Sequence, residues 1–354
     1  MTHPPRLSAA AALAFAGLVA FAAAAPAADI IVNTTSDSII DNDGRCTLRE
    51  AVAAANADAA LHGCTAGSGA DTILLPSSEI VMTAAGSGEN GNLTGDYDIS
   101  DDLTIRPASP GDITFIDANG LDRIFEVQDG ANLALERLQL RGGDVVGFGG
   151  AIVTFETTSV LTLDSTVVAD NTSTLFGGGI AAAGPTELID SLVFDNSSAF
   201  GGGVYLFNNN KLVLLRSEVS DNAVSSDGGG IFGAGVVLVE STLSDNTAGR
   251  DGGGLFLQEN DGPSVSTMLN STVAFNEAER HGGGFYSDFS GTLQLFNVTV
   301  AFNAADSDGD DAGDGGGIFV ESGTVLPRHS IFGGNADGST GGVSAPDCSG
   351  PIES

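Results

Sequence analysis

One position in a set of internal repeats carries residues that could perform acid–base chemistry. The residue just before a recurring glycine step is acidic or a histidine in four repeats, at Asp227, Asp251, His281 and Asp314. If the repeats stack, His281 lies in a column between Asp251 and Asp314. A neighbouring carboxylate raises a histidine's proton affinity and orients its ring, which suits a general acid or base near neutral pH. The alternative, which we prefer, is a solvated polar corner, because loops on stacked repeats vary freely.

A second acidic set could bind a metal ion. An insertion in the longest repeat places Asp306, Asp308 and Asp310 at alternate positions and is followed by Asp314. Carboxylate oxygens are the ligands that calcium prefers. The glycine and the terminal glutamate expected of an EF-hand loop are missing, so a flexible acidic loop is the alternative. Calcium held by these four residues is the cofactor candidate, and we expect it to stabilise the last repeats rather than to perform chemistry.

Two cysteines flank the one helical signal, and we predict a disulfide between Cys46 and Cys64. A straight helix running through His62 would hold the two sulfurs about 20 Å or more apart, at a rise of about 1.5 Å per residue. The helix must therefore end near Asn56, with residues 57–63 folding back. A disulfide persists in an oxidising compartment, so the expected export makes this pairing chemically allowed.

The His281 column and the acidic insertion belong to a stretch from Phe148 to Asn335 in which one pattern occurs seven times. Each repeat has a glycine step followed by an apolar residue. The apolar residues of successive repeats are 24 to 33 residues apart: Ile152, Ile180, Val204, Ile231, Leu255, Phe285 and Ile318. Each repeat reads as three short strands, without helical periodicity. Units with one apolar face bury it by stacking, and parallel crossovers are overwhelmingly right-handed. We therefore predict an all-β, right-handed parallel β-helix with a short N-terminal capping helix.

Asparagines recur in step with the glycines and predict a structural ladder. They end a short β-rich run in every repeat: Asn171, Asn196, Asn222, Asn246, Asn276, Asn303 and Asn335. We expect their side chains to stack at one corner, to bond coil to coil and to adopt a left-handed backbone conformation. The glycines are expected at positive φ or at close approaches between coils. Phe148, Phe176 and Phe200, which precede the first three glycine steps, are interpreted as core stacks.

The helical signal lies in residues 46–56, where Thr47 and Glu50 form a capping box and an apolar face follows. A helix here would cover the open end of the first coil. Its first six residues, Cys46 to Ala51, resemble the signature of the CSLREA domain of exported bacterial β-helix proteins. The similarity continues through the following strands and the glycine repeats, which also look like those of polymorphic outer-membrane proteins. The resemblance implies a fold and an extracytoplasmic location, and it carries no catalytic residues.

The chain divides into five expected segments. Residues 1–28 resemble a secretory signal peptide, with an apolar core that is too short and alanine-rich to favour the alternative of a membrane anchor. Residues 29–70 form the cap, 71–147 the first coils, 148–335 the glycine-repeat coils and 336–354 a C-terminal tail. We expect the tail to be truncated. Its Cys348 has no nearby partner in the sequence and is expected to be a free or intermolecular thiol.

Charge and composition bound the function. Without the leader the chain has 46 acidic against 11 basic residues, an excess of 35 negative charges, which disfavours nucleic acid and anionic membranes as partners. The chain has no tryptophan, three tyrosines and one lysine, which leaves few groups that could grip a polyanionic sugar. We expect a secreted or cell-surface, adhesin-like binding or structural module that does not insert into membranes. Its ligand would be extracellular, with carbohydrate or a cell-surface component as candidates. The competing hypothesis is a polysaccharide lyase or glycoside hydrolase that uses the His281 column.

Overall fold

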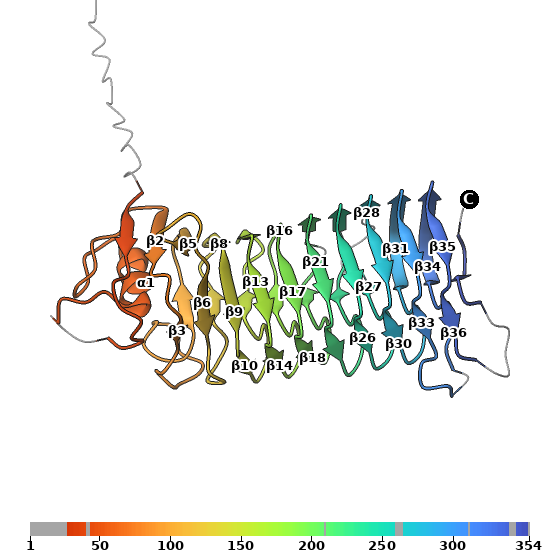
Figure 1. Cartoon of the computed structure of the whole chain (residues 1–354), viewed down its shortest axis with the longest axis horizontal. Helices are drawn as coiled ribbons and strands as arrows, with labels where there is room; N and C mark the ends of the chain where they lie inside the picture. The colour runs from red at the N-terminus through yellow and green to blue at the C-terminus, as the bar shows by residue number, and fades with distance from the viewer. Residues whose placement is uncertain are drawn as a thin grey trace, which may run out of the picture.

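The computed structural model describes residues 27–39, 43–208, 210–258, 265–310, 312–339 and 345–352. The predicted signal peptide lies almost wholly outside these residues, so its removal stays a prediction. The described chain is a stack of β-strand coils along one axis, with the only described helix at the N-terminal end (Figure 1). Equivalent strands of successive coils pair in parallel. The predicted parallel β-helix is confirmed, and its handedness stays a prediction.

Three parallel sheets run along the stack, and the short sheet begins only at β10. The long sheet contains β1 (Asp29–Ile31), β2 (Asp71–Leu75), β4 (Tyr97–Ile99), β5 (Leu103–Pro107), β7 (Phe125–Val127), β8 (Leu133–Glu136), β11 (Ile152–Thr154), β12 (Leu161–Asp164), β15 (Ile180–Ala182), β16 (Thr186–Ile189), β19 (Val204–Leu206), β20 (Leu212–Leu215), β23 (Ile231–Phe232), β24 (Val236–Val239), β27 (Leu255–Gln258), β28 (Val265–Leu269), β31 (Phe285–Phe296), β34 (Ile318–Arg328) and β37 (Cys348–Ser349).

The middle sheet contains β3 (Ile80–Val81), β6 (Thr114–Asp117), β9 (Leu138–Arg141), β13 (Val167–Ala169), β17 (Leu192–Phe194), β21 (Glu218–Ser220), β25 (Thr242–Ser244), β29 (Thr272–Ala274), β32 (Thr299–Ala301) and β35 (Ile331–Gly333). The short sheet contains β10 (Asp144–Val145), β14 (Thr172–Ser173), β18 (Ser197–Ser198), β22 (Ala223–Val224), β26 (Thr247–Ala248), β30 (Glu277–Ala278), β33 (Ala304–Ala305) and β36 (Ala336–Asp337).

The strands follow from alternation of apolar and polar residues. In β12, Leu161 and Leu163 are buried while Thr162 and Asp164 point outward. The inward position pairs in register with the next coil, so Leu163 lies beside Leu188 of β16. Stacking therefore makes one continuous apolar core inside the coils, which no single coil could bury alone.

The asparagine ladder forms as predicted at the corner between the middle and short sheets. Asn222 is fully buried. Its Nδ2 donates to the main-chain oxygen of Val193 at 3.0 Å and to Oδ1 of Asn246, one coil on, at 3.0 Å. The predicted left-handed conformation of the asparagines is wrong, because positive φ belongs to the residue before each one: Asp170, Asp195, Asp221, Asp245, Phe275, Phe302 and Gly334. That residue makes the turn and leaves the amide side chain pointing inward.

The glycine step turns the corner between the short and long sheets. Gly228 has φ +73°, and a Cβ on it would lie 2.9 Å from Cβ of Phe232. The next glycine has a different reason, since a Cβ on Gly229 would lie 2.3 Å from the carbonyl oxygen of Gly253 in the adjoining coil. Both predicted roles of glycine, positive φ and close approach, are confirmed.

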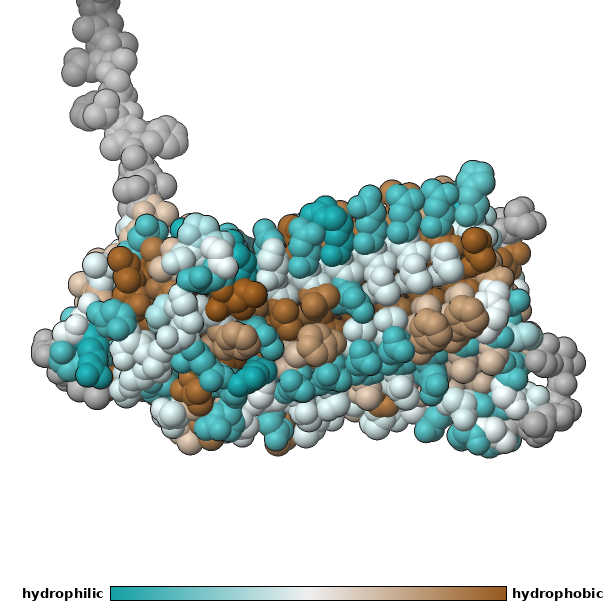
Figure 2. Space-filling model, in the orientation of Figure 1, coloured by the Kyte–Doolittle hydropathy of each residue, from teal (hydrophilic) through white to brown (hydrophobic). Residues whose placement is uncertain are grey.

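The capping helix is confirmed as α1 (Leu48–Asn56), and it contacts β1, β2 and β4. Both hydrogen bonds of the predicted capping box are present between Thr47 and Glu50. No helix in the described part of the chain is long and apolar enough to cross a membrane. On the face over β17 and β21, hydrophilic residues run in rows along the long axis, with hydrophobic groups between them (Figure 2).

Candidate functional site

The signature residues of the capping helix are used for structure. Arg49 is fully buried. Its guanidinium donates to both carboxylate oxygens of Asp37, at 2.9 and 3.3 Å, and to the carbonyl oxygens of Gly95 and Asp96, at 2.7 and 2.9 Å. It also lies 4.6 Å from the ring centre of Tyr97. This arginine therefore joins α1 to two segments distant in sequence, and it offers nothing to a substrate.

The other signature residues are equally engaged. Cys46 and Cys64 form the predicted disulfide, with 4.8 Å between their Cα atoms. The helix ends at Asn56, as the disulfide required. Glu50 is buried, and its Oε1 lies 3.1 Å from Nδ1 of His62. This histidine is thus a partner of the cap rather than a free catalytic group.

A buried ionisable network lies behind the cap, and sequence reasoning missed it. Arg123 pairs with Asp96 at 3.1 Å and with Glu126, while Gln128 donates to Asp98 at 2.6 Å and to Glu126 at 3.0 Å. Burial raises the pKa of Asp96 to about 8, although Arg123 opposes the shift. Burial also raises the pKa of Asp98 to about 6, aided by the nearby Glu126. The two aspartates on either side of Tyr97 were the available signal, and we did not use it.

Aromatic side chains gather on the outer face of the long sheet. One outward position of successive coils is in register, and its occupants are Val153, Ala181, Tyr205, Phe232, Phe256, Tyr286 and Phe319. We call the five aromatic members the aromatic ladder. Each follows directly after the apolar residue of the glycine step, so the sequence carried a signal that we did not use.

Most of the ladder is closed to ligands because its rings cover one another. Phe232 stacks on Phe256 with ring centres 4.8 Å apart and planes 3° from parallel, and Phe256 stacks on Tyr286 at 4.7 Å. These three rings are only 5 to 6% exposed. Tyr286 also donates to Glu321, and burial followed by that hydrogen bond raises the pKa of Tyr286. The closed part therefore stabilises the stack, as offset aromatic pairs do.

Phe148, Phe176 and Phe200 correct a prediction. Phe148 stacks on Phe176 at 5.3 Å, and Phe176 contacts Phe200 at 5.6 Å, but all three are half-buried and lie outside the core within the coils. Phe176 instead stacks on Tyr205 of the aromatic ladder at 4.4 Å. The ring is directed outward because the next residue is a glycine at positive φ, which turns the chain at that point.

Beyond the N-terminal end of the aromatic ladder, three further aromatic rings meet edge to face. Phe148 is 76° from the plane of Phe155 and 86° from that of Phe207. Together with Ala183 and Asn208, these rings line a cavity of about 230 Å³. Phe155 is 45% exposed. We call this the aromatic pocket, and it offers ring surface that no neighbouring ring covers.

The predicted His281 column is present, and its residues contact one another mainly through the main chain. His281 pairs with Asp314 as a parallel bridge, and its main-chain N–H donates to Asp251 at 3.1 Å. Its imidazole stacks on Phe319 at 4.3 Å, and within the described residues its Nδ1 is buried without a hydrogen-bond partner. Asp314 instead accepts from Ser349 at 2.7 Å. The structure thus brings the three residues together but shows no imidazole–carboxylate hydrogen bond among the described contacts.

The carboxylates beside this column are held by arginines. Arg280 pairs with Asp251, and Arg250 pairs with Asp227 at 3.3 Å. Burial raises the pKa of Asp227, with the neighbouring Ser226 hydroxyl and Arg250 opposing the shift. A carboxylate with a fixed cationic partner is a poor proton carrier, so the pairs serve the corner rather than a reaction.

The four acidic residues proposed for calcium separate into two places. Carboxylate oxygens of Asp306, Asp308 and Asp310 lie within 4.8 Å of one another, whereas Asp314 belongs to the His281 column. Cys348 is free, as expected, and burial raises the pKa of its thiol to about 11. Comparison of the chain with known protein families, curated proteins and solved structures found no match.

Proposed function

We propose that this chain is an exported, elongated β-helix that serves outside the cell as a binding module for neutral carbohydrate. The observation that carries the proposal is the aromatic pocket formed by Phe148, Phe155 and Phe207. The faces of sugar rings are apolar and pack against aromatic rings, and concave apolar sites with a few polar groups are the usual form of ligand sites. Asn208 supplies such a polar group at the rim.

Charge supports a neutral rather than an acidic sugar. The chain has a net charge of −34, and a polyanionic glycan would be repelled over the whole surface. The aromatic pocket lies on the outside of a rigid stack, so a long polymer can approach it without a deep cleft. The state of the nearby acids also favours binding over hydrolysis, because Asp227 and Asp251 are paired with arginines.

Export is supported by two independent features. The leader-like residues 1–28 precede a chain whose cap contains the Cys46–Cys64 disulfide, and disulfides persist in oxidising compartments. We further propose that the cap is a CSLREA domain, because the buried contacts of Arg49 and Glu50 give its signature a structural reason. Homologues that keep the signature but lack Asp37 or the second cysteine would contradict this assignment.

Binding to insoluble neutral polysaccharides tests the proposal. The secreted chain should be retained on at least one of a panel of glucans, mannans and xylans, and Phe155→Ala with Phe207→Ala should weaken retention at least about tenfold, the effect of about 1.4 kcal/mol. Phe275→Ala is the matched control, since Phe275 is 52% exposed but lies at the turn after β29, away from the aromatic pocket.

The same panel separates binding from catalysis. Release of reducing ends or unsaturated sugars, lost in His281→Ala, would favour the polysaccharide-acting enzyme instead. Retention that is equal in the pocket variant and the control would place the binding surface elsewhere. Failure to bind any neutral polymer would overturn the proposal.

A further inference from the structure

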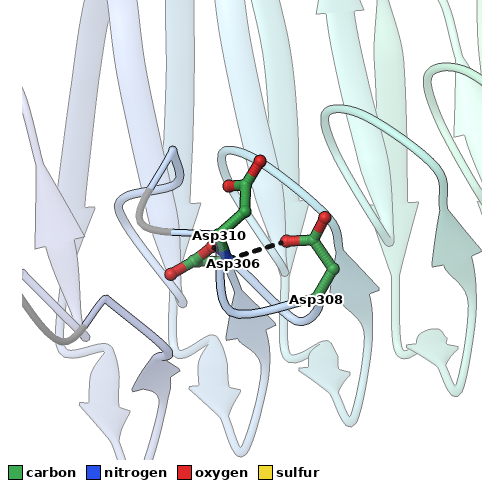
Figure 3. A group of neighbouring side chains, drawn as sticks. All are labelled: Asp306, Asp308 and Asp310. Carbon is green, nitrogen blue, oxygen red and sulfur yellow. Dashed lines mark hydrogen bonds between the residues drawn. The ribbon is translucent and has the colours of Figure 1, made fainter.

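The insertion between β33 and β34 folds into a tight acidic turn. Asp306 has φ +51° and Gly309 has φ +73°, and the Gly309 N–H donates to the carbonyl oxygen of Asp306 at 3.1 Å. The Asp310 N–H donates to Oδ1 of Asp306 at 3.1 Å. The turn thereby carries Asp306, Asp308 and Asp310 side by side (Figure 3), with one carboxylate oxygen of each within 4.8 Å of the others.

One of these carboxylates is buried with one of its two oxygens unpaired. Asp306 is 1% exposed, and its Oδ2 has no hydrogen-bond partner among the residues that the structure describes. Its two oxygens share one carbon, so Oδ2 lies beside the cluster that Oδ1 helps to form. Arg280 directs its guanidinium to Asp251, and its carbonyl oxygen accepts from the Asp306 N–H at 3.0 Å. A buried anionic oxygen without a partner costs free energy, which a bound cation would recover.

We propose that this turn binds one calcium ion through the carboxylates of Asp306, Asp308 and Asp310. Calcium takes six to eight oxygen ligands in flexible geometry, so carbonyl oxygens of the turn and water can complete its shell. Magnesium demands a near-ideal octahedron and gives up its water reluctantly, so it is usually bound through one or two carboxylates rather than three. Extracellular calcium sites of this kind have dissociation constants of about 10⁻⁴ to 10⁻³ M.

The position of the turn defines what the ion would stabilise. Gly338 of the last coil donates its N–H to Ala305 at 3.1 Å, and Ser339 Oγ donates to the carbonyl oxygen of Gly313 at 3.1 Å. A Cβ on Gly313 would lie 2.6 Å from Cβ of Asp306, so the two ends of the turn touch. A calcium ion held by the turn therefore fastens the last coil to the one before it.

Two exposed aspartates elsewhere on the stack provide a control. Asp221 and Asp245 are exposed at the turns that precede the asparagine ladder. They match Asp308 and Asp310 in exposure and charge, but they belong to no group of three ligands among the described residues. Replacing either pair by asparagine removes the same net charge, so the two double variants separate a specific site from general screening of negative charge.

Calorimetry and thermal unfolding of the full mature chain test the proposal. Titration with calcium chloride should show one site, and the unfolding midpoint should rise by several degrees in millimolar calcium but not in millimolar magnesium. Asp308→Asn with Asp310→Asn should abolish both effects, and Asp221→Asn with Asp245→Asn should leave both unchanged. Hydrogen exchange should slow with calcium mainly in β35 and β36.

Two results would overturn the site. The first is a wild-type chain that shows neither calcium heat nor a midpoint shift at 10 mM calcium. The second is a midpoint shift that is equal in wild type and in both double variants, which would assign it to screening alone. Neither result depends on the carbohydrate proposal, since no sugar is present in these measurements.

Discussion

The N-terminal cap and the glycine-repeat coils are held together by different kinds of contact. In the cap, Arg49 and Asp37 are a fully buried ion pair, and one disulfide joins Cys46 to Cys64. In the coils, the same neutral amide contact recurs, as between Asn222 and Asn246. The cap thus depends on contacts that occur once, and the coils depend on one contact that is repeated.

The position of each region in the stack explains this difference. An inner coil has a similar coil on both sides, so an amide that both donates and accepts finds the same partner at every step. The first coil has a neighbour on one side only, and α1 has no repeating partner there. A specific charged pair fixes how the helix sits over this end. An end cap is therefore positioned by contacts that are specific to it, whereas a coil is positioned by the same contact repeated from coil to coil.

Removing the guanidinium of Arg49 should break the cap most severely. Arg49→Met leaves the buried Asp37 carboxylate without its cation, and loss of one partner of a buried pair costs about 3–5 kcal/mol. Urea unfolding measures this loss. The control is Arg216→Met, whose exposed pair with Asp190 should contribute much less to stability. Equal losses would show that burial of the cap pair adds nothing.

The buried acids near the cap should make stability fall as pH rises. Burial raises the pKa of Asp98 to about 6 from 3.8, so folding holds a proton that the unfolded chain releases. The contribution of protonated Asp98 to the free energy of unfolding is complete below about pH 4. It falls by about 3 kcal/mol as the pH rises to about 6. Asp98→Asn should flatten this part of the profile. Glu187→Gln, an exposed change on β16, should not, and a matching effect there would refute the assignment.

Breaking one rung of the coils should cost less than breaking the cap. Asn222→Ala removes amide bonds to Val193, Ser220 and Asn246 and leaves buried main-chain groups without partners, at about 2–3 kcal/mol. The exposed Asn297, which donates to Asn270 at 3.1 Å, provides the control Asn297→Ala. If both substitutions shift the urea midpoint equally, the buried asparagine ladder contributes no more to stability than an exposed amide contact.

The smallest effect is expected in the closed part of the aromatic ladder. Phe256→Leu keeps an apolar side chain but removes two ring stacks, with Phe232 and Tyr286, for a loss of about 1 kcal/mol. Phe275→Leu removes one exposed stack with Phe302 and should cost less. Thermal unfolding of the two variants decides the order, and a reversed order would mean that the ladder contributes no more than an exposed pair.

The sequence by itself determined the features that repeat. The glycine step, the asparagine ladder and the parallel stacking of coils were predicted because each coil contacts only its neighbours, so a periodic sequence implies periodic contacts. The prediction of three strands per repeat is wrong for most coils, which contain four, as in β11, β12, β13 and β14. The capping box and the Cys46–Cys64 disulfide were also predicted, because both depend on short-range geometry around one helix.

The tertiary structure alone decided the contacts between segments that are not equivalent. Nothing in the spacing of the chain indicated that Arg49 meets Asp37 and Asp96, or that Asp98 and Glu126 are buried together. The same holds for Phe155 and Phe207, which both meet Phe148 edge to face. Such contacts depend on side-chain directions after the coils have stacked, and a linear period carries no record of them.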